Sequence, residues 1–169
     1  MDNVQQARIR RTRAFQDDPK AFVARIEADL DRFIAACNKQ GYRPAVRLNA
    51  TSDVAWWKYG FIHFYPNVQF YDYPKRPVHL WPDLPAYHRT FSHDPSNGWG
   101  PTQAALDAGH NVAVVFEVGK HDALPDTWAD YPVLDGRTHD YRFLDPTGPH
   151  IVGLSALGYA KGSNFAITI

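Results

Sequence analysis

The chain has 169 residues, 44% of them hydrophobic and 14% aromatic, enough for one core but short of the roughly 250 residues of a complete eight-stranded α/β barrel. Its 18 Lys and Arg balance its 18 Asp and Glu, so no overall field attracts nucleic acid or an anionic membrane. The single cysteine, Cys37, excludes an intramolecular disulfide and a cysteine-only zinc or iron–sulfur site. No segment reaches the roughly 18 apolar residues of a membrane span. We expect a soluble, cytoplasmic protein with no membrane contact and no cofactor.

The amino terminus is predicted to be a basic arm, residues 1–16, ahead of a single α/β domain, residues 17–169. Residues 1–48 carry ten Lys and Arg against six Asp and Glu, a net charge of +4, and the rest of the chain has a net charge of −4. The arm owes its charge to Arg8, Arg10, Arg11 and Arg13. It could bind nucleic acid, with bases stacking on Tyr71, Tyr73 and Trp81. Alternatively, the arm is solvated and those aromatic residues belong to the core.

A long helix is predicted from about residue 19 to residue 40. Asp18 followed by Pro19 is typical of a helix start, because the carboxylate caps backbone N–H groups and proline needs no N–H at the first helical position. Apolar residues then recur at helical spacing, and Gly41 closes the helix. Cys37 falls on the apolar face and is expected in the core.

A β-α-β unit is expected next. Residues 45–49 form a short strand, any of Thr51-Ser52-Asp53 can cap a second helix to about Phe64, and residues 68–73 form a second strand after Pro66 and Asn67. A right-handed crossover of this kind pairs the two strands in parallel.

Short strands and long loops follow. Residues 74–85 hold four prolines and are predicted to be a stiffened loop. The apolar run 112–116 predicts a central strand buried on both faces. Further strands are expected at 87–92, 131–134, 141–144 and 151–154, with a helix at 101–108. The order of elements favours an α/β fold, a single domain resembling a partial β/α barrel with a mainly parallel sheet.

Polar residues follow the carboxyl ends of the predicted strands, where α/β folds bind their ligands. We therefore predict a polar pocket for a small anionic or nucleotide-like ligand. Lys75 would contact the anion, and carboxylates would bind hydroxyls or orient a base. The residues expected to line the pocket are Asn49, Ser52, Asp53, Asp72, Lys75, Ser92, Glu117, His139, Asp140, Arg142, Asp145 and Lys161.

The segment from Asp135 to Asp145 concentrates charge and has two interpretations. It holds three carboxylates, a histidine and two cations, and an imidazole oriented by a carboxylate suits acid–base or metal chemistry. Alternatively, Asp135-Gly136 is a hairpin turn whose charges pair on its surface.

Two further motifs are weak. The eight histidines show no recognised ligand spacing, and His88 with His93 and Asp94 comes nearest, so we expect no metal site. The run Gly153 to Gly158 with Lys161 is not a Walker motif, although its backbone N–H groups and Lys161 could hold a phosphate or carboxylate.

Several ordered motifs between residues 7 and 160 resemble the phage gene-product-88-like family. They include Val46-Arg-Leu-Asn49, Val68-Gln-Phe-Tyr-Asp-Tyr73, Tyr87-His88-x-Thr90-Phe-Ser92, Asn111-Val-Ala-Val-Val-Phe116 and Arg142-Phe-Leu-Asp-Pro146. The resemblance implies a protein of phages and mobile elements, acting in the bacterial host cytoplasm, and carries no established activity.

A more distant likeness is to α/β barrels of the radical-SAM type. It rests on an arginine-bearing strand that ends near Ser52-Asp53, followed by the aromatic strand up to Lys75. Such proteins need a cysteine triad, and Cys37 alone cannot hold a cluster. The chain is then expected to be a shortened binding protein or a fragment of a longer enzyme.

Two functions stay open at this point. One is binding of the small ligand, with catalysis undecided. The other is a non-enzymatic protein that binds a host protein or nucleic acid, for example to inhibit a defence system. Convergence of Asp53, Asp72, Lys75, Asp140 and Asp145 in one concavity favours the first, and a flat surface with exposed Trp or Tyr favours the second.

Overall fold

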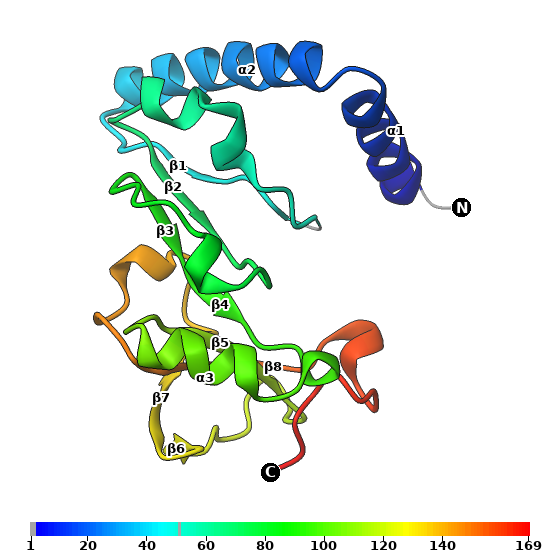
Figure 1. Ribbon diagram of the computed structural model, residues 1–169, viewed down its shortest axis with the longest axis vertical. Helices are drawn as coiled ribbons and strands as arrows, with labels where there is room; N and C mark the ends of the chain where they lie inside the picture. The colour runs from blue at the N-terminus through cyan, green and yellow to red at the C-terminus, as the bar shows by residue number, and fades with distance from the viewer. Residues whose placement is uncertain (1–2, 51) are drawn as a thin grey trace. The chain divides into compact units, whose positions relative to one another are not determined.

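The computed structural model describes residues 3–50 and 52–169, and the chain forms two compact units (Figure 1). The first unit comprises the described residues up to Ala45 together with Trp56–Gln69. The second comprises the described residues of Val46–Ala55 together with Phe70–Ile169. The predicted α/β class with a mainly parallel sheet is confirmed, and neither of the two sheets found in the described residues closes into a barrel.

The first unit contains the two long helices. α1 (Asn3–Asp17) takes in most of the predicted basic arm, and α2 (Pro19–Gln40) has the predicted bounds. The Asp18 carboxylate accepts a hydrogen bond from the Ala21 N–H at 2.9 Å, and Gly41 ends α2 in the left-handed conformation, with φ of 72°. Cys37 is buried, as predicted.

The predicted helix up to Phe64 is wrong. The structure has two 3₁₀ turns instead, η1 (Trp56–Tyr59) and η2 (Phe61–Phe64). Gly60 separates them with φ of 76°, a left-handed conformation that interrupts a helix. The first of the expected caps, Thr51, lies outside the described residues.

A three-stranded sheet has the order β1-β2-β3, from β1 (Ala45–Arg47), β2 (Gln69–Asp72) and β3 (Tyr87–Arg89). β2 and β3 run parallel, with Asp72 opposite Arg89. The strand predicted over 87–92 is divided at Thr90, whose N–H donates to the Asp72 carbonyl at 3.1 Å. Its second half, β4 (Phe91–Ser92), belongs to another sheet. The proline-rich loop contains only the 3₁₀ turn η3 (Val78–Leu80).

The second sheet has the order β4-β5-β8-β7-β6. Its further strands are β5 (Val112–Phe116), β6 (Thr127–Trp128), β7 (Tyr131–Asp135) and β8 (Ile151–Ser155). All pairings are parallel except that of β6 with β7. α3 (Gly100–Asp107) lies along this sheet in Figure 1 and buries Ala105 and Leu106 against Val112 and Val114. The prediction that Val114 lies in a central parallel strand is confirmed.

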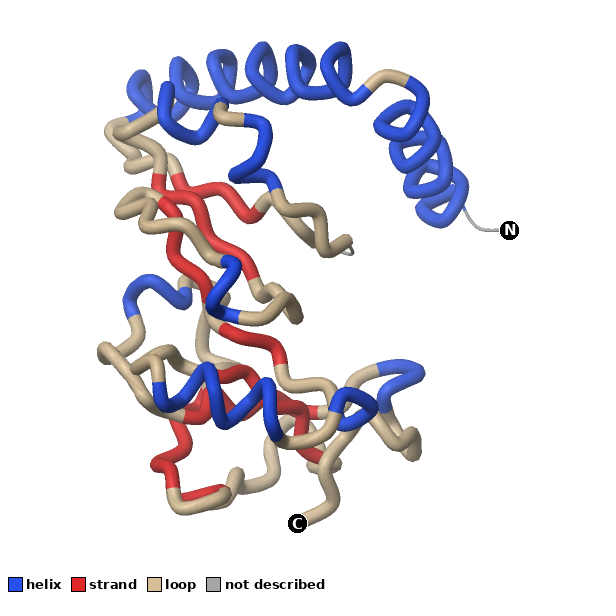
Figure 2. The backbone as a smooth tube through the Cα atoms, viewed as in Figure 1, coloured by secondary structure: helices blue, strands red, loops and turns tan. Residues whose placement is uncertain are grey.

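Long loops join these strands, as the tan segments of Figure 2 show. Residues 141–144 are not the predicted strand but hold the 3₁₀ turn η5 (Arg142–Leu144), because the Arg142 side chain is buried within its own loop. Asp135-Gly136 is not a hairpin turn, since β7 and β8 are parallel, but the expected charge pairing is present between Asp135 and Arg137 at 2.7 Å. The remaining 3₁₀ turns are η4 (Pro95–Asn97) and η6 (Gly158–Ala160). Within the described ranges, no helix is long and apolar enough to cross a membrane.

Candidate functional site

Asp72, at the end of β2, is the centre of a buried hydrogen-bond network. Its carboxylate has no exposed surface and accepts hydrogen bonds from the Asn49 N–H at 2.7 Å, the Asn49 side-chain amide at 2.9 Å and the Tyr87 hydroxyl at 2.5 Å. Burial raises the pKa of Asp72 to about 6, and the three hydrogen bonds oppose that rise. Burial and the Asp72 charge raise the pKa of Tyr87, so its hydroxyl stays protonated and donates.

Asn49 extends this network into the loop after β1. Its side-chain oxygen accepts hydrogen bonds from the Ser52 hydroxyl at 2.7 Å and the Val54 N–H at 3.1 Å. Its amide also donates to the Val54 carbonyl at 3.0 Å. Ser52 and Asp72 are therefore linked through Asn49, and these three predicted ligand-binding residues hold a loop in place. We call them, with Tyr87, the Asp72 network.

Asp140 organises a second cluster, which is half-exposed. Its carboxylate accepts hydrogen bonds from the Tyr71 hydroxyl at 3.2 Å and the Tyr73 hydroxyl at 2.7 Å, and lies 3.3 Å from the Arg47 guanidinium. The guanidinium also stacks 4.4 Å from the centre of the Tyr73 ring. Burial, reinforced by Asp140, raises the pKa of both tyrosines.

Arg142, His139 and Asp145 form a third group in the loop between β7 and β8. The Arg142 guanidinium is 1% exposed, donates to the His139 carbonyl and lies 3.4 Å from the Asp145 carboxylate. Burial raises the pKa of Asp145, and the Arg142 charge opposes the rise. This buried ion pair fixes the loop, and the carboxylate is committed to it.

Two of the remaining predicted residues, Asp53 and Glu117, have other partners. Arg76 donates to the Asp53 carbonyl at 2.8 Å, and the Glu117 carboxylate accepts a hydrogen bond from the Gly162 N–H at 3.0 Å. Lys161 is exposed beyond η6. Asp53, Asp72, Lys75, Asp140 and Asp145 thus each pair with a different side chain or backbone group. The structure distributes the predicted set among separate local networks.

A further group of polar side chains gathers where β4 ends, beside β5. The Lys75 ammonium lies 2.6 Å from the Asp94 carboxylate and 4.7 Å from the centre of the Phe165 ring. The hydrogen bond from Lys75 holds the pKa of Asp94 at about 2. Ser92 ends β4 and is half-buried. This is the carboxyl edge of a parallel sheet, where open α/β folds bind ligands.

His93 is the central residue of this edge. Its ring is 7% exposed, and its Nδ1 lies 2.7 Å from the Thr102 hydroxyl of α3. Its Nε2 makes no hydrogen bond to any residue that the structure describes. Burial lowers the pKa of His93, so the imidazole is neutral near pH 7.

Two tryptophans flank His93. Its ring centroid lies 6.2 Å from that of Trp99 and 5.5 Å from that of Trp128, and the two indoles are 5.3 Å apart at 75°. Trp128 reaches this position from β6, which turns into β7 through Ala129 and Asp130, both with positive φ. His93, Lys75, Asp94, Trp99 and Trp128 are called the His93 site below.

Sequence reasoning did not include Trp99, Trp128 or His93 among the ligand-binding residues. Trp128 lies in a strand of only two residues, which no hydrophobic period can reveal. The available signal was the position of His93 directly after a strand. Among the described residues, no group of three or more His, Cys, Asp or Glu could hold a metal ion. His88 bonds the Thr90 hydroxyl at 3.2 Å instead, and burial lowers its pKa to about 4.

The family model described as gene product 88 matches residues 1–168. The chain belongs to the gene product 88 family. The predicted resemblance to this phage-type family is therefore confirmed. No curated protein and no solved structure matches the chain.

The His93 site of this gene product 88 protein offers a neutral imidazole nitrogen that bonds no described residue, an indole of Trp99 that is 37% exposed, and an ammonium group. Together these can accept or donate a hydrogen bond, stack on a planar ring and attract an anion.

Proposed function

We propose that the protein binds a small nucleotide-like anion at the His93 site. The observation that carries this proposal is a neutral histidine between two tryptophans, at the carboxyl edge of a parallel sheet, whose Nε2 bonds no residue that the structure describes. A buried imidazole that uses one nitrogen within the fold keeps the other for a ligand.

Each part of a nucleotide has a matching group. The base stacks on the exposed indole of Trp99 and bonds His93 Nε2, while the phosphate meets the Lys75 ammonium. Lys75 already pairs with Asp94, but an ammonium group has three donors and can bridge a carboxylate and a phosphate. Of the residues predicted from the sequence, Lys75 stays in the proposed site, and the Asp72 network serves the fold.

The test is isothermal titration with AMP, adenosine and inorganic phosphate. AMP is expected to bind more tightly than adenosine or phosphate alone, because only AMP uses both the indole and the ammonium. Trp99→Leu is expected to weaken AMP binding about tenfold or more, from the loss of a stacking interaction of roughly 1–3 kcal/mol. Lys75→Ala is expected to weaken AMP binding but leave adenosine binding unchanged.

Tyr42→Leu is the matched control, because Tyr42 is an exposed aromatic residue of the first unit, which contains no residue of the His93 site. It should bind AMP like the unaltered protein. Absence of AMP binding, or equal losses in the Trp99 and Tyr42 variants, contradicts the proposal. Action on a host protein or a defence system stays a prediction from the family resemblance alone.

A further inference from the structure

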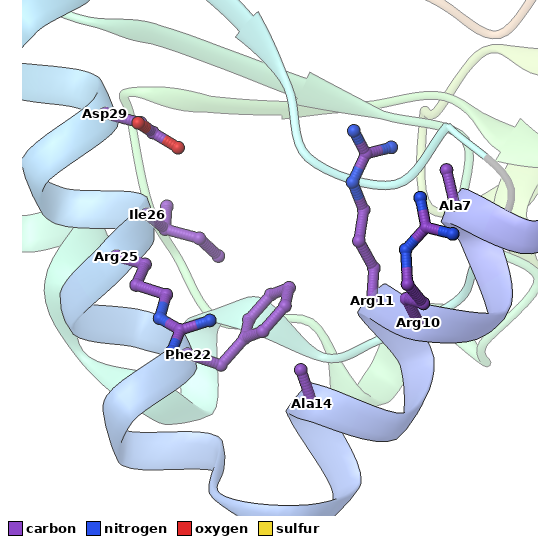
Figure 3. Close-up of a pocket in the computed structure, with 8 residues that line it drawn as sticks. All are labelled: Ala7, Arg10, Arg11, Ala14, Phe22, Arg25, Ile26 and Asp29. Atoms are coloured by element: carbon purple, nitrogen blue, oxygen red, sulfur yellow. The ribbon is translucent and has the colours of Figure 1, made fainter. Parts of the chain in front are cut away.

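A groove of about 390 Å³ lies between α1 and α2, within the first unit (Figure 3). From its charge and shape we infer that it binds a single-stranded nucleic acid. This inference is independent of the His93 site, since none of its residues belongs to that site.

The groove is built from two matching helical stripes. On α1, the lining residues run from Ala7 to Ala14 at spacing i, i+3, i+4 and i+7, and on α2 they run from Phe22 to Asp29 at the same spacing. Residues with this spacing share one face of a helix. Figure 3 shows the side chains of both helices directed into the space between them. The groove is therefore lined by one face of α1 and one face of α2.

Three arginines make the groove strongly basic. Arg10 and Arg11 come from α1 and Arg25 from α2, and none of them forms an ion pair with a described residue. Asp29, the one carboxylate among the described lining residues, is paired with Arg32. The whole chain has a formal net charge of zero, so this positive charge is a local feature. Unpaired guanidinium groups from two directions suit a chain of phosphates.

The apolar part of the groove selects the form of nucleic acid. Phe22 and Ile26 lie beside the arginines, and the Phe22 ring is held 5.5 Å from Phe15 and 6.3 Å from Trp56. A duplex keeps its bases stacked inside and would present only phosphates to these side chains. A single strand can rest a base on Phe22 while its phosphates meet the arginines, which is how sequence-tolerant single-strand sites work.

The test is fluorescence anisotropy of the full chain with a labelled oligo(dT) of about 12 nucleotides, the matching oligo(U) and a DNA duplex, at about 50 to 200 mM salt. With three phosphates neutralised, the slope of log K against log salt is expected to be about −2 for the single strand. Arg11→Ala and Arg25→Ala should each weaken binding and reduce the magnitude of the slope by about 0.7. Asp29→Asn should tighten binding, because it removes the negative charge from the lining.

Arg13→Ala is the matched control. It removes the same charge from the same exposed helix, but Arg13 does not line the groove. Its affinity should stay within about twofold of the unaltered protein. Far-UV circular dichroism checks that each variant keeps its helices, which alanine favours.

Four outcomes overturn the inference. They are absence of salt-dependent binding, a loss in Arg13→Ala equal to that in Arg11→Ala, tighter binding of the duplex than of the single strand, and preferential binding of anionic phosphatidylglycerol vesicles. An equal loss in Arg13→Ala would mean diffuse attraction to α1 rather than a groove. Failure of AMP to bind, by contrast, affects only the His93 site.

Discussion

β2 and β4 both end at a polar residue, but the polar groups at the two ends differ in how many of their hydrogen bonds are made within the fold. Each strand ends in a polar residue, Asp72 in one case and Ser92, followed by His93, in the other. Asp72 accepts three hydrogen bonds and has no exposed surface, whereas His93 keeps one nitrogen without a partner in the described structure. A buried polar group that makes all its hydrogen bonds within the protein stabilises the fold. One that has a free donor or acceptor can bind a ligand.

The comparison predicts its largest effect at Asp72. Asp72→Leu removes a buried acceptor of hydrogen bonds from the Asn49 amide and the Tyr87 hydroxyl. The free energy of unfolding should fall by about 3–5 kcal/mol, measured by urea denaturation. A loss below about 1 kcal/mol would mean that the network is not structural.

The free energy of unfolding should depend on pH through the titration of Asp72. Folding raises the pKa of Asp72 from 3.8 to about 6, so the folded protein holds a proton that the unfolded chain loses. The contribution of Asp72 is then fully present below about pH 4 and is lost as the pH rises through about 6, by about 3 kcal/mol.

His88 acts in the opposite direction, because burial lowers its pKa to about 4, and its contribution is lost as the pH falls. The measurement is therefore the difference in unfolding free energy between the unaltered protein and Asp72→Asn across this range. The free energy of unfolding of the unaltered protein should fall relative to that of Asp72→Asn as the pH rises from about 4 to about 6. Parallel curves would contradict the assignment.

A smaller loss of stability is expected when Asp140 is replaced, because Asp140 is less buried than Asp72. Asp140→Ala also removes a carboxylate that accepts from tyrosines, but the Asp140 side chain is 50% exposed and water can replace it. We expect a loss of about 1 kcal/mol or less in urea denaturation. A loss as large as that of Asp72→Leu would show that burial does not separate the two clusters.

Local signals explain what the sequence could predict of the fold. α2 has its capping residues at both ends, and β5 is a continuous apolar run, so both were found. The turns at 56–64 and 142–144 depend instead on Gly60 and on the burial of Arg142 within its loop. Neither feature produces a periodic pattern of apolar residues in the sequence.

The candidate site was only partly predictable for a related reason. A polar residue after a strand is visible in the sequence, but the sheet to which that strand belongs is not. The division of 87–92 at Thr90 assigns β3 and β4 to different sheets, so the expected residues separate. The groove, by contrast, has a sequence signature, because its lining residues recur at i, i+3, i+4 and i+7 both from Ala7 to Ala14 and from Phe22 to Asp29.

The most direct test of the account compares AMP binding by His93→Asn and Asp72→Asn, measured by isothermal titration on folded protein. We expect His93→Asn to lose about tenfold or more in affinity, because the shorter amide can replace Nδ1 beside Thr102 but places no group where Nε2 lies. We expect Asp72→Asn to keep the affinity of the unaltered protein even though its stability changes. Retained affinity in His93→Asn together with lost affinity in Asp72→Asn would contradict the account, because the ligand would then belong to the Asp72 network.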